Sequence, residues 1–235
     1  TNDIKMMIKQ PAFMPNVAIV DPVLTLTSPP AITAATGIDA LSHAIESYLS
    51  RQAHPYTDML ALSAMKLIVE NMLTVYEEGN NIEAREAMAL GSMQAGLSFS
   101  NASVALVHGM SRPIGALFHV PHGISNAMLL PAVLDYSKET CVERLADLGT
   151  FFNHDRLEMS QSELADFAIE SIKVLCKKMN IGNLKDWGID EQAFYEAIPK
   201  MATDALASGS PGNNPKVPTH EELIELYKVA YHYEF

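Results

Sequence analysis

The chain has 235 residues, of which 48% are hydrophobic and 19% are charged, so it can bury a core of its own without disulfides. Its formal net charge is -12, and an acidic surface repels phosphate backbones, which excludes nucleic acid from the expected partners. The two cysteines, Cys141 and Cys176, match no metal-binding or redox spacing, and we expect them to be reduced thiols.

The N-terminal segment lacks the basic, apolar and small-residue pattern of a secretory signal. No uninterrupted apolar run approaches the ~20 residues that span a bilayer. We therefore expect a cytoplasmic protein without a membrane partner.

Residues 1–30 hold five of the 13 prolines, which interrupt helices and separate short extended stretches. The stretches 17–20 and 23–26 predict one or two edge strands in a connecting segment. Because strands need partners and the chain offers few other strand patterns, we expect the rest of their sheet to lie outside this chain.

From Ala31 onward, apolar residues recur at helical spacing, which predicts a mostly α-helical domain over residues 31–235. The small residues Gly91, Ala95 and Gly96 favour close contact between helices over a weak helix. The predicted helices cover 31–49, 58–76, 82–99, 102–110 and 124–134, and a loop with Gly115, Pro121 and Gly123 precedes the last one.

Two capping boxes predict further helices, because the first residue of each box satisfies a free N–H group at a helix start. The box that begins at Ser160 opens a helix that runs to about Met179, and the box at Thr219 opens the C-terminal helix. Residues 208–215, rich in Gly, Pro and Asn, predict the loop between them.

Asp39 and His43 are four residues apart on a predicted helix, so their side chains lie on one face, one turn apart. A carboxylate and an imidazole in this arrangement form half of a site for a divalent metal. The pair alone is weak evidence, because such pairs occur more often as surface hydrogen bonds.

His108 and His122 flank the predicted loop. His108 follows an apolar helical stretch and is expected to point inward, and His122 precedes a helix whose positive end disfavours a charged imidazole. A metal requires the neutral form. On residue type alone, two buried core histidines remain an alternative to two ligands.

One carboxylate and three imidazoles suit Fe²⁺, Zn²⁺ or a similar first-row ion. Four protein ligands leave an open position only when the ion takes five or six ligands, which Fe²⁺ does more readily than structural Zn²⁺. The donor set therefore favours a catalytic site over a structural one.

Two long stretches resemble the group III, iron-containing alcohol dehydrogenases, namely ATGIDALSHAIESYLS (35–50) and LVHGMSRPIGALFHVPHGISNAMLLPAVL (106–134). The resemblance extends over the whole chain, including AIVDP (18–22) and NPKVPT (214–219). It implies that Asp39, His43, His108 and His122 ligate iron, with Zn²⁺ or Mn²⁺ also possible, in an all-α, dehydroquinate synthase-like domain.

The resemblance also implies a second domain. Members of this family place an α/β dinucleotide-binding domain with a glycine-rich loop before the helical one, and this chain contains no such loop. Residues 1–30 are then expected to be strands and a connector left from that absent domain, and 31–235 the iron-binding domain. We expect the isolated chain to be inactive and the full enzyme to form a homo-oligomer.

By resemblance, the metal polarises the oxygen of a small alcohol or aldehyde while hydride passes to or from NAD(P). Phe99 and Ser210 match positions that line the substrate and cofactor cleft. Many relatives carry a relay histidine where this chain has Arg112, which cannot shuttle protons near neutral pH but can anchor a polar substrate or a phosphate. His119 is an alternative relay, or an ordinary loop histidine.

Two other classes of function stay open. A helical module could hold iron without catalysis, although the Glu-x-x-His repeats of ferritin-like di-iron bundles are missing. A zinc glycerol dehydrogenase or a metal-free reductase would also share this architecture. The complete set of four donors counts against both of these relatives.

Overall fold

The computed structural model describes residues 10–153, 155 and 158–235 of the chain. Over these residues it consists of α-helices and short 3-10 helices, and no strand occurs among them. The α-helices are α1 (Pro30–Leu49), α2 (Pro55–Glu77), α3 (Ile82–Ala102), α4 (Leu106–Phe118), α5 (His122–Ser137), α6 (Val142–Phe152), α7 (Gln161–Lys178), α8 (Glu191–Ala207) and α9 (His220–Tyr231). The 3-10 helices are η1 (Pro11–Phe13), η2 (Pro22–Thr25), η3 (Lys138–Thr140) and η4 (Ser210–Asn213).

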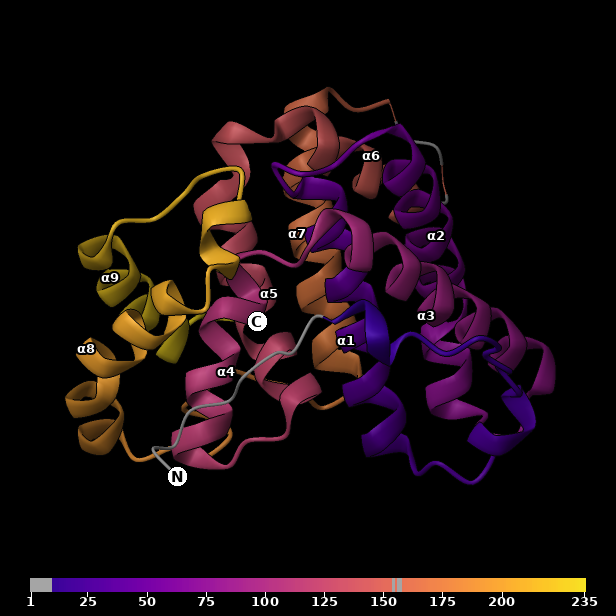
Figure 1. Ribbon diagram of the computed structural model, residues 1–235, viewed down its shortest axis with the longest axis horizontal. Coiled ribbons are helices and arrows are strands. Elements are labelled where there is room, and N and C mark those ends of the chain that lie inside the picture. The colour runs from indigo at the N-terminus through magenta and orange to yellow at the C-terminus, as the bar shows by residue number, and fades with distance from the viewer. Residues whose placement is uncertain (1–9, 154, 156–157) are drawn as a thin grey trace.

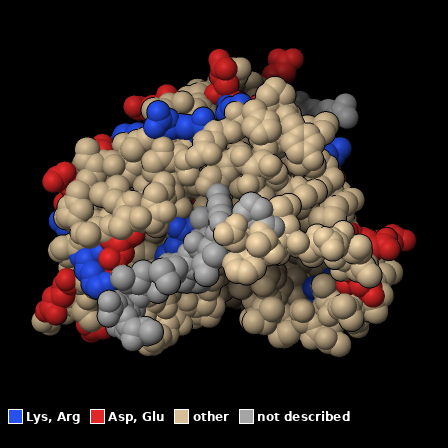
Figure 2. Space-filling model, viewed as in Figure 1, with Lys and Arg blue, Asp and Glu red and all other residues tan. Residues whose placement is uncertain are grey.

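The helices form two groups around α1, α4 and α5, which occupy the middle of the molecule (Figure 1). On one side α2 and α3 pack against α1 and against each other. On the other side α8 packs against α4 and α9 packs against α5. Helix α7 packs against α5 and α6, and α6 also contacts α2. The charged side chains on the face shown in Figure 2 gather mainly near its edge.

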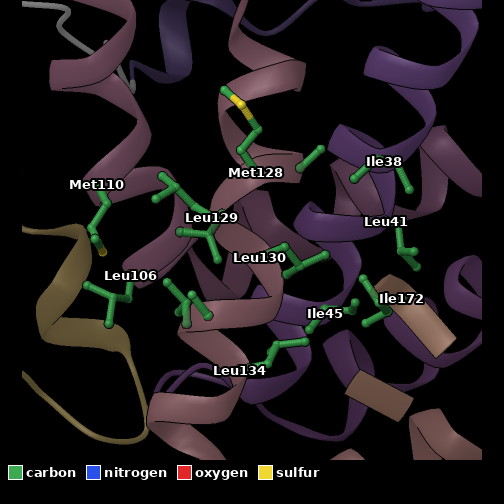
Figure 3. Close-up of a cluster of buried hydrophobic side chains, with 14 of the residues drawn as sticks. Ile38, Leu41, Ile45, Leu106, Met110, Met128, Leu129, Leu130, Leu134 and Ile172 are labelled. Carbon is green, nitrogen blue, oxygen red and sulfur yellow. The ribbon is translucent and has the colours of Figure 1, made fainter. Parts of the chain in front are cut away.

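The core is built where α1, α4, α5 and α7 meet (Figure 3). Apolar side chains of α1 reach toward α5, and Ile172 of α7 closes the same layer. These side chains are almost fully buried, and burying one such side chain stabilises the fold by about 1.5–3 kcal/mol. The labelled members are Ile38, Leu41, Ile45, Leu106, Met110, Met128, Leu129, Leu130, Leu134 and Ile172.

The strands expected at 17–20 and 23–26 are absent, and that prediction is wrong. The second stretch lies in η2, where Asp21 accepts a hydrogen bond of 2.9 Å from the backbone N–H of Val23 and Pro22 presets the first turn. An extended segment becomes a strand only when another strand supplies its hydrogen bonds, and the described residues offer none.

The loop expected around Gly115 is also shorter than predicted. Helix α4 continues through Pro113 and Gly115 to Phe118, and only residues 119–121 separate it from α5. The reason is tertiary packing, since Met110 and Ile114 are fully buried at helical spacing and outweigh the low helix propensity of proline and glycine.

Helices α6 and α8 were not predicted from the sequence, whereas both capping boxes are confirmed. Ser160 and Thr219 each accept a hydrogen bond from the backbone N–H of the third residue of α7 and α9, and the carboxylate of the glutamate there accepts one from the backbone N–H of the capping residue. Asp190 caps α8 in the same way but lacks the reciprocal glutamate, so its signal in the sequence is weaker.

Helix α2 has 23 residues and a mean hydropathy of 1.3 in its most apolar part, enough by length and composition to cross a membrane. The same composition occurs in core helices of proteins outside membranes. In this structure α2 packs against both α1 and α3, and Met65, Ile68 and Met72 are fully buried there, which accounts for part of its apolar character.

Close helix contacts depend on glycine at several points. A Cβ at Gly91 would lie 2.9 Å from Ile68 of α2, as the sequence predicts, whereas Gly96 on the same helix faces open space, against prediction. A Cβ at Gly123 would lie 2.2 Å from the carbonyl oxygen of Ala35, so the first turn of α5 touches the backbone of α1 directly. Gly149 of α6 approaches α7 equally closely.

Replacing Gly149 with alanine should lower the free energy of unfolding by about 1–3 kcal/mol, because overpacking forces helices apart. The new Cβ would lie 2.2 Å from the carbonyl oxygen of Leu164, a backbone atom that cannot rotate away. The matched change Gly96→Ala should instead raise that free energy by up to about 1 kcal/mol, since alanine favours a helix and meets nothing there. Urea unfolding of both variants measures this, and equal effects would contradict it.

Candidate metal centre

Helix α1 presents one polar stripe between otherwise buried apolar residues. Asp39, His43 and Glu46 follow one another at spacings of four and three, which places them on the same face of the helix. The neighbouring Ile38, Leu41 and Ile45 point into the core. The stripe therefore holds its three ionisable side chains in a fixed order along a rigid, buried helix.

The other two histidines come from α4 and α5. His108 lies in the first turn of α4, and its side chain is only 4% exposed, as the sequence predicts. His122 is the first residue of α5, also as predicted, and its side chain is 30% exposed. Both helix starts thus face the polar stripe of α1.

Three imidazoles surround the carboxylate of Asp39. Asp39 Oδ1 lies 3.9 Å from His43 Nδ1, 3.5 Å from His108 Nε2 and 3.9 Å from His122 Nε2. One donor atom from each of Asp39, His43 and His108 can be chosen within 4.8 Å of the others. Donor atoms that share a cation at about 2.0–2.2 Å lie roughly 3–4 Å apart, so the spacing suits a single metal ion.

Asn126, one turn after His122 on α5, tests whether a cation fits. Its side-chain nitrogen lies 2.5 Å from Asp39 Oδ1, 3.1 Å from His108 Nε2 and 3.3 Å from His122 Nε2. The two ring nitrogens donate or accept according to their protonation, while Asn126 Oδ1 is buried without a partner in the described part of the chain. A carboxylate, imidazole nitrogens and this buried amide oxygen thus lie close together, and a divalent cation could bind between them, so the residues fit a metal.

The pKa shifts of Asp39 and His43 favour the protonation states that bind a metal ion. Burial alone would raise the pKa of Asp39, but its hydrogen bond with His108 and the nearby imidazoles hold that pKa well below its usual range. Burial and the neighbouring His108 lower the pKa of His43 to about 4, so His43 is neutral near pH 7 and keeps a free lone pair.

His108 behaves differently. Burial lowers its pKa, but the charge of Glu46 and the hydrogen bonds to Asp39 and Glu46 outweigh burial and raise the pKa to about 9. The two carboxylates therefore attract a positive charge to this spot, a proton when no metal is present. Metal binding must displace that proton, which is the usual coupling between metal affinity and protonation.

The amino-acid sequence matches the C-terminal model of the Fe-containing alcohol dehydrogenase family over residues 33–231. That match covers far more than half of the chain, including all four converging side chains. The chain belongs to the Fe-containing alcohol dehydrogenase family.

Similar proteins agree. The chain is 39% identical to the 1,3-propanediol dehydrogenase of Citrobacter freundii over 93% of this chain and 56% of that protein. It is 37% identical to the NADPH-dependent butanol dehydrogenase of Clostridium saccharobutylicum, over 98% of this chain and 60% of that protein. The structure superposes on that of sulfoacetaldehyde reductase from Bifidobacterium kashiwanohense in complex with NAD⁺ with a TM-score of 0.83 and 29% identity, over 97% of this chain and 57% of that one.

The chain thus spans between about half and two thirds of the length of these family members. In the family structures that match, the corresponding part is the helical domain, which confirms the all-α fold class and the family resemblance inferred from the sequence.

The three pocket residues expected from the resemblance lie on two sides of the cluster. The ring of Phe99, on α3, stacks on that of His43 with centroids 4.3 Å apart and an angle of 20° between the planes. Arg112 lies one turn after His108 on α4, and its Nη1 donates a hydrogen bond of 2.8 Å to Ser210 Oγ in η4. Both Arg112 and Ser210 are buried.

The cluster is partly exposed to solvent. His108 is enclosed, whereas the side chains of Asp39, His43 and His122 are 20%, 19% and 30% exposed. Solvent therefore reaches the cluster at α1 and at the start of α5. His119 is exposed at the left-handed C-cap of α4, with φ 55°, which agrees with an ordinary loop histidine.

Two residues of the site were not singled out from the sequence. Glu46 continues the stripe of Asp39 and His43 by one further turn, and Asn126 follows His122 at the same spacing of four that relates Asp39 to His43. Both spacings can be seen in the sequence. However, His108, which contacts Glu46, and Asp39, which contacts Asn126, lie 62 and 87 residues away from them, so the sequence does not show these contacts.

Adding Zn²⁺ at about 100 times its Kd should raise the free energy of unfolding by about 2.7 kcal/mol, because the ion binds only the folded cluster. His108→Ala removes the enclosed donor and should abolish that gain. Thermal unfolding with and without the ion measures it. His232→Ala serves as the control, since this half-exposed histidine lies outside the cluster and should leave the gain intact. An equal gain in both variants would contradict the site.

Proposed function

We propose that this chain is the metal-binding catalytic part of an NAD(P)-dependent alcohol dehydrogenase or aldehyde reductase. The observation that carries the proposal is the convergence of one carboxylate and three imidazoles, partly exposed to solvent, in a member of the Fe-containing alcohol dehydrogenase family. Its substrate would be a small alcohol, diol or aldehyde, in line with the names of its relatives.

In this proposal Asp39, His43, His108 and His122 hold one divalent ion. Fe²⁺ is the ion expected from the family, and the same donor set accepts Zn²⁺ or Mn²⁺. When bound, the ion supplies Lewis-acid polarisation of the alcohol or carbonyl oxygen.

The chain's own residues hold the donors in place and shape the approach. Phe99 covers one face of the His43 ring, so it keeps that imidazole in position and presents an apolar surface beside the cluster. We assign it to the substrate pocket, where an apolar wall would limit water around the reacting carbon.

Arg112 and Ser210 would form the polar edge of the same pocket. Burial lowers the pKa of Arg112, while the charge of Glu46 opposes this, and the guanidinium stays protonated near neutral pH. It therefore cannot replace a relay histidine in moving protons. Its hydrogen bond to Ser210 fixes it in the position where relatives carry that histidine.

The coenzyme would be bound mainly by a dinucleotide-binding domain that precedes residue 31. The relatives that this chain covers to only 60% and 57% of their length include one named for NADPH and one solved with NAD⁺, so either coenzyme is compatible. Residues 1–30 would then connect the two domains. We further expect a homo-oligomer in the cytoplasm, where the buried Cys141 and Cys176 stay reduced.

The decisive experiment joins this chain to the N-terminal part of the Citrobacter freundii 1,3-propanediol dehydrogenase that the alignment leaves unmatched. After anaerobic loading with Fe²⁺, the fusion should oxidise 1,3-propanediol with NAD⁺ or NADP⁺, followed by absorbance of the reduced coenzyme. Asp39→Asn keeps the shape of the side chain but removes its charge. It should lower kcat/KM by more than about 100-fold, because the ion would be lost.

The controls separate the parts of the proposal. The isolated 235-residue chain should show no turnover, and steady turnover would contradict the need for a further domain. Activity of the fusion that survives both chelation and Asp39→Asn would contradict the metal-dependent mechanism itself.

A further inference from the structure

Glu46 is a buried carboxylate that the reaction proposed above does not use. It is 3% exposed and lies on α1, one turn beyond His43 on the polar stripe. Burying a carboxylate without compensation costs several kcal/mol, so such a group is kept only where specific partners satisfy it. Those partners show what Glu46 does.

Both oxygens of Glu46 contact the same residue. Oε2 accepts a short hydrogen bond from the ring Nδ1 of His108, and Oε1 accepts one of 3.2 Å from the backbone N–H of His108. With Nδ1 engaged, only Nε2 is left to face Asp39, at 3.5 Å. One carboxylate therefore fixes the rotation of the ring and decides which nitrogen points to the centre.

The hydrogen bond from the backbone N–H of His108 to Glu46 also caps the start of α4. His108 is the third residue of α4, and the first four N–H groups of a helix have no partner within it. The residue before the helix is Ala105, which has no side chain to cap them. Glu46 takes over this function from α1, and its negative charge also suits the positive end of α4.

His108 and Arg112 lie on one face of α4, and the charge of Glu46 acts on both of them. A neutral amide of the same shape offers a single acceptor oxygen, because its NH₂ group donates. In the Glu46→Gln variant a donating NH₂ group would therefore replace one of the two oxygens that accept from the ring and from the backbone of His108.

We propose that Glu46 is a positioning residue that anchors the ring and backbone of His108 so that its Nε2 is presented to the metal. This inference rests on the proposed metal site. It adds an outer carboxylate to that site, an arrangement that orients the imidazole and strengthens it as a ligand. Glu46 itself would touch neither metal nor substrate.

The test is Glu46→Gln in the 235-residue chain, compared with the wild type and with Ser42→Ala. Ser42 is equally buried on α1, but its hydroxyl donates to Ile38 O within the same helix, so it controls for loss of a buried polar group. The Kd for Zn²⁺ is measured by competition with a chromophoric chelator. It should rise about 10–100-fold in Glu46→Gln and stay near the wild-type value in Ser42→Ala.

A second readout separates positioning from general stability. The visible spectrum of the Co²⁺-saturated protein depends on the geometry of the ligands, so it should change in Glu46→Gln and not in Ser42→Ala. Destabilisation alone would leave the spectrum of the saturated, folded protein unchanged. If Glu46→Gln loses its helical circular dichroism, Glu46→Asp takes its place, since it keeps the charge but draws it back by one methylene.

The outcomes are distinct. Weaker Zn²⁺ binding together with a changed Co²⁺ spectrum supports the inference. Wild-type affinity and spectrum in the folded variant overturn it while leaving the metal site intact. Absence of Zn²⁺ binding in the wild type would overturn the metal site, and the role of Glu46 with it.

Discussion

The site depends on one constraint: α1 carries two carboxylates and an imidazole although most of its residues are buried. Asp39, His43 and Glu46 share a face, and that face is covered by the first turns of α4 and α5. Charged groups in such surroundings need compensation from positive charge or from hydrogen-bond donors. Helix starts supply both, because their free N–H groups and the positive end of the helix point outward.

The two helix starts compensate this face in different ways. Helix α4 provides His108, whose ring and backbone N–H donate hydrogen bonds to the two oxygens of Glu46. Helix α5 provides His122 and Asn126, which face Asp39. The protein groups satisfy Glu46 completely but leave Asp39 facing three imidazoles and one amide, with Asn126 Oδ1 lacking a partner among the described residues. The charge of Asp39 and the buried Asn126 Oδ1 are thus the groups that a cation would compensate.

Local patterns predicted much of this arrangement. The spacing of Asp39 and His43 fixes their common face whatever the rest of the chain does, and the capping boxes at Ser160 and Thr219 carry their own hydrogen bonds. The convergence of His108 and His122 on that face was predicted only through resemblance to a family, since no local rule joins positions so far apart. The roles of Glu46 and Asn126 were missed for the same reason.

The errors in the fold have a common origin as well. Strands were predicted in residues 17–26 from β propensity alone, without a partner strand to pair with. Pro113 and Gly115 were predicted to lie beyond the end of a helix, but the burial of Met110 and Ile114 continues that helix through them. In both cases long-range contacts, or their absence, overrode local propensity.

The glycine after His122 has a consequence of its own. Its missing Cβ lets the backbone of α5 touch the carbonyl of Ala35, so Gly123 is required by packing, whereas His122 beside it is proposed to be required by chemistry. The two demands can separate in the course of evolution. In a related protein that no longer bound the metal, His122 could be replaced while Gly123 was retained. A chain with this glycine but without the histidine would therefore have kept the helix packing after losing the reaction.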